Sequence, residues 1–163
     1  MNKYVLSLLV DDQPGVTSRI SGLFTRRGYN IESFSSGSTE IPDKTRITLV
    51  VNGDREILEQ IKKQLQKLID VVSIRELKPE ESVYRELALI KVNTNDGNRA
   101  SVLEVTDIFR GKVIDVATDC VILEVTGDHA KLEAFIDLMK PYGIREIVRT
   151  GLTALNRRNH TAS

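Results

Sequence analysis

An internal repeat constrains the fold of this chain more than any other feature. The segment "VNGDREILEQI", residues 51–61, aligns with "VTGDHAKLEAF", residues 125–135, so that the end of a strand, a glycine, an aspartate and a leucine coincide. In both copies the aspartate precedes a stretch with helical spacing, where it serves as a helix cap. The repeat indicates that one supersecondary unit is written twice within 163 residues.

The first copy begins with the nearly continuous apolar run "YVLSLLV", which predicts a buried strand at residues 4–10. Apolar residues then recur with a helical period at Val16, Ile20, Leu23 and Phe24, and Gly28 ends the predicted helix. The remaining predicted elements are a weaker strand at 30–38, a strand in "TRITLVV", a helix capped by Asp54, and a strand in "VVSIREL".

The second copy repeats this order with "ELALIKV", a helix over Arg99–Phe109, "KVIDV", "CVILEV", a helix over Ala130–Met139 and "IREIVRT". The sequence therefore predicts an α+β fold with two ferredoxin-like βαββαβ domains in tandem. We expect the first domain at 1–77, a polar linker "KPEESV" at 78–83, the second domain at 84–157 and a tail at 158–163.

This fold places two helices on one face of a four-stranded antiparallel sheet. The other face and both edge strands are then expected to lack cover. Exposed edges favour side-by-side pairing of two sheets, so we expect at least a homodimer.

Composition excludes several classes of function. Lys+Arg and Asp+Glu are equal at 23 each and Trp is absent, so neither nucleic acid nor an anionic membrane is expected as a partner. The one cysteine, Cys120, excludes an internal disulfide. The N-terminal apolar run is too short for a signal peptide and no run approaches a membrane span, which favours a cytoplasmic protein.

Catalytic and metal-binding patterns are also missing from the sequence. The two histidines are His129, at the start of a predicted helix, and His160, in the tail. Neither forms part of a Ser/His/Asp set or has metal-ligand spacing, so we expect no catalytic residue and no metal site in this chain.

The turn "DDQPGVTS", residues 11–18, is the candidate binding feature. It delivers the first N–H groups of a helix, which attract anions, and Gly15 lets a ligand approach the backbone. Asn30, just past the helix, offers donors and an acceptor, so a small amphoteric ligand fits this set. A purely structural interpretation is also open, with Asp12 as an N-cap, Pro14 as a first-turn proline and Gly15 as a turn residue.

The same residues carry a resemblance to a known family. Residues 11–34 resemble the first loop and helix of an ACT domain, the amino-acid-sensing βαββαβ module. The strings "GLFTRRGYNIES", "LEQIKKQLQKLIDVV" and "DIFRGKVIDV" are more specifically similar to the regulatory (small) subunit of acetohydroxyacid synthase, also called acetolactate synthase. The likeness extends from Tyr4 to about Arg157.

The resemblance implies a non-catalytic partner of a large catalytic subunit that joins two pyruvates, or pyruvate and 2-ketobutyrate, in valine, leucine and isoleucine biosynthesis. It implies that the small subunit activates the large one and confers feedback inhibition by a branched-chain amino acid, usually valine, bound where two ACT domains meet. Thiamine diphosphate, Mg²⁺ and FAD would belong to the catalytic subunit, and no cofactor is expected in this chain.

Carried over by motif, the effector-binding residues implied by the resemblance are Asp12, Pro14, Gly15, Val16, Thr17, Ser18, Asn30 and Ile31. Many members of the family have asparagine at the position of Asp12. A carboxylate there would repel the carboxylate of an amino acid and attract its ammonium group. Arg27 and Arg110 are the expected contacts with the catalytic subunit.

Two other functions share parts of this pattern. A free-standing ACT-type sensor that regulates another enzyme or transcription is the main alternative, and a transcriptional role would require a basic recognition helix outside the repeats, which the sequence lacks. An RNA-recognition module also has the βαββαβ order, but its central strands carry aromatic residues, and "TRITLVV" and "CVILEV" carry none.

Overall fold

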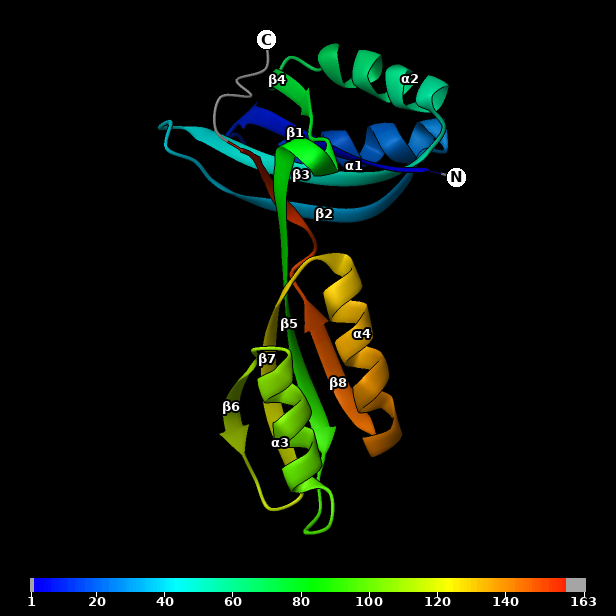
Figure 1. The fold of residues 1–163 in the computed structure, drawn as a ribbon. Helices are drawn as coiled ribbons and strands as arrows, with labels where there is room; N and C mark the ends of the chain where they lie inside the picture. Colours follow the sequence, from blue (N-terminus) through cyan, green and yellow to red (C-terminus); the bar gives the residue numbers. More distant parts are fainter. Residues whose placement is uncertain (1, 158–163) are drawn as a thin grey trace. The chain divides into compact units, whose positions relative to one another are not determined.

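The computed structural model describes residues 2–157, which fold into two compact units (Figure 1). The first unit contains the chain through Val83 and the segment that begins at Leu152, and the second is Tyr84–Gly151. The chain therefore returns to its first unit at the end, whereas the sequence had placed residues up to 157 in the second domain. The expected tail, 158–163, lies outside the described residues.

The first unit has the predicted order of elements in one antiparallel sheet, with strands arranged β2-β3-β1-β4. Both helices cover the same face of that sheet (Figure 1). The elements are β1 (Asn2–Asp11), α1 (Val16–Arg27), β2 (Asn30–Ser38), β3 (Lys44–Gly53), α2 (Arg55–Gln66) and β4 (Val71–Glu76).

The core of the first unit lies between these helices and the sheet, as the apolar spacing predicted. The four α1 positions singled out from the sequence, Val16, Ile20, Leu23 and Phe24, are all buried. Each such side chain contributes about 1.5–3 kcal/mol by leaving water. Asp54 caps α2 by accepting a hydrogen bond from the Ile57 N–H at 2.8 Å, also as predicted.

The opposite face of this sheet differs from the expectation that it would be uncovered. Val5 and Leu9 on β1 and Val50 on β3 are buried although they point away from the helices. The returning segment contributes to this cover, because Leu152 is buried and its N–H donates to Ser33 Oγ on β2 at 3.0 Å. A sequence pattern cannot show this contact, since the two residues are far apart along the chain.

The second unit repeats the order, with strands arranged β6-β7-β5-β8. Its core includes Val102, Phe135 and Ile136 from the helices, packed on alternate residues of β5 and β7. Leu89 on β5 and Val148 on β8 are exposed on the other face, so this face is open as expected. The elements are β5 (Ser82–Asn93), α3 (Arg99–Ile108), β6 (Lys112–Val116), β7 (Cys120–Gly127), α4 (His129–Met139) and β8 (Ile144–Arg149), whereas β9 (Thr153–Asn156) belongs to the returning segment of the first unit and pairs with β5.

The expected linker at 78–83 is ordered secondary structure. A 3₁₀ turn, η1 (Pro79–Glu81), leads directly into β5, and a second one, η2 (Lys140–Tyr142), follows α4. The returning segment holds this stretch, because the Arg157 N–H donates to the Glu81 carbonyl at 2.8 Å and Ser82 Oγ bonds Asn156 Oδ1 at 3.1 Å. Within residues 2–157, no helix has the length and apolar character needed to cross a membrane.

Candidate functional site

The start of α1 lacks a side-chain cap. Its N-cap residue is Gly15, with φ 86° and ψ −3°, and no side chain accepts a hydrogen bond from the first turn. An L-residue in this left-handed conformation costs roughly 1–2 kcal/mol. A Cβ at this position would lie 3.1 Å from Arg19 Nη1. The Val16 N–H donates to the Gln13 carbonyl at 3.4 Å, and the following N–H groups of the first turn stay open to an anion at the positive end of the helix dipole.

The structural interpretation of the turn is corrected at two positions. Asp12 does not cap α1, because Gly15 occupies the cap, and Pro14 precedes that cap rather than standing in the first turn. The Asp12 N–H instead donates to the Asp43 carbonyl at 2.9 Å, which ties the turn to the loop before β3.

A hollow of about 300 Å³ lies beside this turn. This volume is at the lower end of the range for small-molecule sites, so it suits a ligand the size of an amino acid. Of the predicted effector residues, Asp12, Val16 and Thr17 line it. Pro14, Gly15 and Ser18 belong to the same turn but do not line the hollow. The full lining is Val10, Asp11, Asp12, Gln13, Val16, Thr17, Ser36, Gly37, Ser38, Thr45 and Ile47.

The far wall of the hollow is a part of the site that sequence reasoning missed. It comes from Ser36, Gly37 and Ser38 at the end of β2. The strand register brings them there, since Ser38 pairs with Thr45 on β3 and the neighbouring Lys44 pairs with Asp11 on β1. The run of small polar residues in "SFSSGS" was the available signal, because short side chains at a sheet edge leave room for a ligand.

Charges around the hollow are arranged asymmetrically. Lys44 Nζ forms an ion pair with Asp11 Oδ1 at 2.5 Å, which balances the charge of the Asp11 carboxylate. Asp12 is exposed, and within the described chain its carboxylate has no hydrogen-bond or ion-pair partner. Behind the turn, Arg19 Nε donates to Asp70 Oδ2 at 2.7 Å and fixes the first turn of α1 against the start of β4. Asp12, whose carboxylate is unpaired, and the first residues of α1 thus line the same hollow.

Asn30 and Ile31 lie at the opposite end of the unit. Asn30 opens β2 and pairs with Asn52, whereas the hollow is at Ser38, where the same strand ends. Eight steps of about 3.3 Å separate the two ends, or about 26 Å in all. Within one chain, the structure therefore does not bring Asn30 to the α1 turn.

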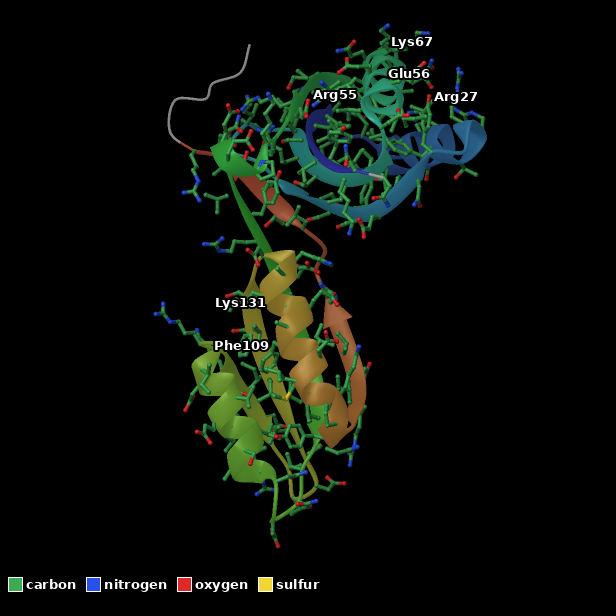
Figure 2. The ribbon with its side chains drawn as sticks, turned by 45° about the vertical axis from the view of Figure 1, so that its right-hand side comes forward. Arg27, Arg55, Glu56, Lys67, Phe109 and Lys131 are labelled. Carbon is green, nitrogen blue, oxygen red and sulfur yellow. The ribbon has the colours of Figure 1, made fainter. Side chains whose placement is uncertain are left out.

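The two predicted contacts with a catalytic subunit lie in different units. Arg27, in the last turn of α1, is exposed and donates from Nη2 to Gln64 Oε1 at 3.1 Å (Figure 2). Arg110 follows α3 in a left-handed conformation, φ 56°, which turns the chain towards β6 and leaves the side chain exposed.

Two carboxylates with altered pKa values hold elements of each unit together. Burial raises the pKa of Glu76, but hydrogen bonds from Arg55 (Figure 2) and the nearby charges of Arg55 and Lys62 outweigh burial and lower it. In the second unit, a hydrogen bond from Arg149 lowers the pKa of Glu133.

Ion pairing explains both of these shifts, so they do not mark a catalytic site. Among residues 2–157 there is no group of three or more His, Cys, Asp or Glu placed to hold a metal ion. His129 is exposed at the start of α4, as expected from the sequence.

Comparisons with known proteins agree over the whole chain. Residues 6–73 match the model described as "AHAS small subunit-like ACT domain", and residues 85–158 match "Small subunit of acetolactate synthase". A probable acetolactate synthase small subunit of Methanothermobacter thermautotrophicus is 46% identical over 97% of this chain and 95% of its own length. The small subunit of Mycobacterium bovis is 49% identical over 94% of this chain and 92% of its own length.

A solved structure gives the same result at the level of the fold. The crystal structure of the acetolactate synthase small subunit from Thermotoga maritima is similar with a TM-score of 0.92 and 42% identity, covering 98% of this chain and 99% of that chain. Relatives with this degree of identity span both units and the returning segment. The chain belongs to the family of acetolactate synthase small subunits.

Proposed function

We propose that this chain is the regulatory subunit that activates an acetolactate synthase catalytic subunit and makes it sensitive to a branched-chain amino acid, most simply valine. The catalytic subunit would condense two pyruvates, or pyruvate and 2-ketobutyrate, and would hold thiamine diphosphate, Mg²⁺ and FAD. The observation that carries this proposal is the match to small subunits along 97% of the chain. The cytoplasmic location expected from the sequence stays a prediction.

The hollow beside α1 supports the effector role. A valine carboxylate placed at the open helix start would accept from the first N–H groups, and its ammonium group would face Asp12. Each charge-assisted hydrogen bond contributes about 1.5–3 kcal/mol, and burying the side chain contributes about as much. One methylene discriminates by only about 1–3 kcal/mol, so leucine and isoleucine are the competitors to test.

A homodimer explains why Asn30 belongs to the site although it is distant within one chain. β2 is an edge strand, so two copies can pair these edges in antiparallel fashion about a two-fold axis. Because the strands run in opposite directions, the Asn30 end of one β2 then lies beside the Ser38 end of the other. The second copy would thereby place its Asn30 and Ile31 next to the hollow formed by Asp12, Val16 and Thr17.

Reconstitution tests the activating role. The purified chain would be mixed with an acetolactate synthase catalytic subunit, and acetolactate formation measured with and without valine, leucine or isoleucine. We expect the rate to rise on adding the chain and to fall again on adding the effector. Equal rates with and without the chain would refute this function.

A mixing experiment tests the shared site. Gly15→Asp and Asn30→Ala would each remove valine binding from their own homodimers. In a mixed dimer, the intact turn of the Asn30→Ala chain meets the intact Asn30 of the Gly15→Asp chain, so calorimetry should show one restored site per dimer. If both residues act within one chain, the mixture will bind no valine.

A further inference from the structure

The edge strand β6 of the second unit is exposed along its whole length. All five of its residues are exposed, and three are large and apolar: Val113 at 42%, Ile114 at 53% and Val116 at 53%. Ile108, in the last turn of the preceding helix, is 70% exposed. Edge strands of natural proteins normally carry few apolar residues or are covered, because their unpaired N–H and C=O groups can form hydrogen bonds with any other extended chain. An apolar edge of this kind indicates a partner.

Two opposite charges lie on the same face of this edge. On the neighbouring strand β7, Lys112 is opposite Glu124 and Asp115 is opposite Ile122, and these two partners are two residues apart, so they point to the same face. The bulge at Ile114 explains why Lys112 and Asp115 share this face although they are three residues apart. Within the described residues, neither Lys112 nor Asp115 forms an ion pair or a side-chain hydrogen bond. The other edge of this sheet differs, since Arg145 and Arg149 on β8 pair with Asp119 at 2.9 Å and with Glu86 at 2.6 Å.

We propose that β6 pairs in antiparallel fashion with β6 of a second copy of this chain, about a two-fold axis between Val113 and Ile114. In this register Lys112 lies opposite Asp115 of the second copy, and the symmetric contact repeats the ion pair. Val113 lies opposite Ile114 of the second copy, so the apolar residues also meet. The interface is self-complementary, as a two-fold contact requires.

The pattern "KVID" favours a second copy over a strand of the catalytic subunit. A two-fold contact requires that a strand carry a charge and its own complement at symmetric positions, and Lys112 and Asp115 meet this requirement. The interface involves neither the hollow beside α1 nor the β2 edge, so it goes beyond the proposed function and is tested independently of it.

Disulfide trapping in the full chain tests the register. Lys112→Cys and Asp115→Cys would be combined in a Cys120→Ser background, which removes the one native thiol. Directly opposed residues of antiparallel strands have Cα atoms about 4.5–5.5 Å apart, within reach of a disulfide. The same two positions within one strand are about 10 Å apart, which prevents an internal bond.

Mild oxidation should convert most of the double-cysteine chain into a covalent dimer. Each single-cysteine chain is the matched control and should form far less, because neither position faces itself across the axis. Equal cross-linking of the double and single variants would overturn the proposed pairing.

Charge reversal gives a second readout in solution. Lys112→Asp or Asp115→Lys alone places like charges opposite each other twice, and sedimentation should show association about tenfold weaker. The combined exchange restores complementarity only for pairing with an identical strand, so its association should return to within about threefold of the original. If the double exchange is as weak as the single ones, the self-pairing is refuted and a strand of the catalytic subunit becomes the occupant.

Discussion

The two units share one order of elements but differ in the turn that leads from the first strand to the first helix. In the first unit this turn ends at Gly15, and α1 starts without a side-chain cap beside a hollow. In the second unit, Asn95 Oδ1 accepts from the Gly97 and Asn98 N–H groups at 2.8 and 3.0 Å, and Asn98 Oδ1 accepts from the Asn95 N–H at 2.7 Å. Neither α1 nor α3 has a side-chain cap, since Asn98 at the start of α3 caps no N–H group either, but only the second turn is closed by these internal side-chain hydrogen bonds.

The two turns also differ in their contacts with the rest of the unit. Arg99, the first residue of α3, donates from Nη2 to the carbonyls of Ala117 and Thr118 at 2.9 and 2.8 Å, so the second turn is also bonded to the loop before β7. By contrast, the helix that follows the third strand begins alike in both units, because Asp54 and Asp128 each accept an N–H from three residues ahead. The two units therefore share the aspartate cap of the second helix and differ in the turn before the first helix.

The largest expected effect comes from closing the open turn. Gly15→Asp adds a Cβ near Arg19, forces an L-residue to φ 86° and places a negative charge where the effector carboxylate would bind. We expect valine affinity to fall at least 100-fold, or about 2.7 kcal/mol, by calorimetry. Gly97→Asp, in the second turn, is the matched control and should leave valine binding unchanged. Retained affinity in Gly15→Asp would remove the turn from the site.

Opening the second turn should affect stability and leave binding intact. Asn95→Ala removes the acceptor of two backbone N–H groups, and we expect a loss of about 1–2 kcal/mol in the free energy of unfolding, measured in urea. Valine affinity should not change. An Asn95→Ala chain that loses valine binding would show that the second turn also serves the effector site.

Substitutions of Arg27 and Arg110 test which of the two units contacts the catalytic subunit. Arg27→Ala in the first unit and Arg110→Ala in the second should each weaken activation of acetolactate formation. The concentration of chain needed for half-maximal activation should rise roughly fivefold, or about 1 kcal/mol. Arg110→Gly relieves the left-handed backbone and separates the effect of the side chain from that of the turn. A variant with unchanged activation removes its unit from the contact.

The smallest expected effect is a difference in acid sensitivity. The pKa values of Glu76 and Glu133 are both lowered from 4.5, so their ion pairs stabilise the folded chain above about pH 4.5, and this contribution is lost as the pH falls through the lower, folded pKa. The Glu76 side chain is 13% exposed and that of Glu133 is 43% exposed. Glu76→Gln should therefore flatten the dependence of the urea midpoint on pH more than Glu133→Gln. The opposite order would contradict this ranking.

Much of the fold followed from local patterns. The helical spacing of Val16, Ile20 and Leu23 predicted which face of α1 is buried, and the glycine and aspartate of the repeat predicted where α2 and α4 begin. Period and capping act over a few residues, so the sequence displays them directly. The turn of the candidate site was found for the same reason, because Gly15 has a local backbone role.

The rest depended on residues far apart in sequence. The wall formed by Ser36–Ser38 follows from strand register, and the cover given by Leu152 follows from the path of the returning segment. The separation of Asn30 from the hollow also required the sheet, since it depends on the direction in which β2 runs. Contacts of this kind have no local signature.

By itself, the sequence determined the duplicated βαββαβ order, the two capped helices and the bare turn at Gly15, because propensity, period and backbone sterics operate within a few residues. Only the tertiary structure decided that a hollow forms beside that turn, that the chain returns to its first unit, and that β6 presents apolar residues and unpaired charges at an edge. Those features arise from which strands become neighbours, and that choice is made by burial of the whole core.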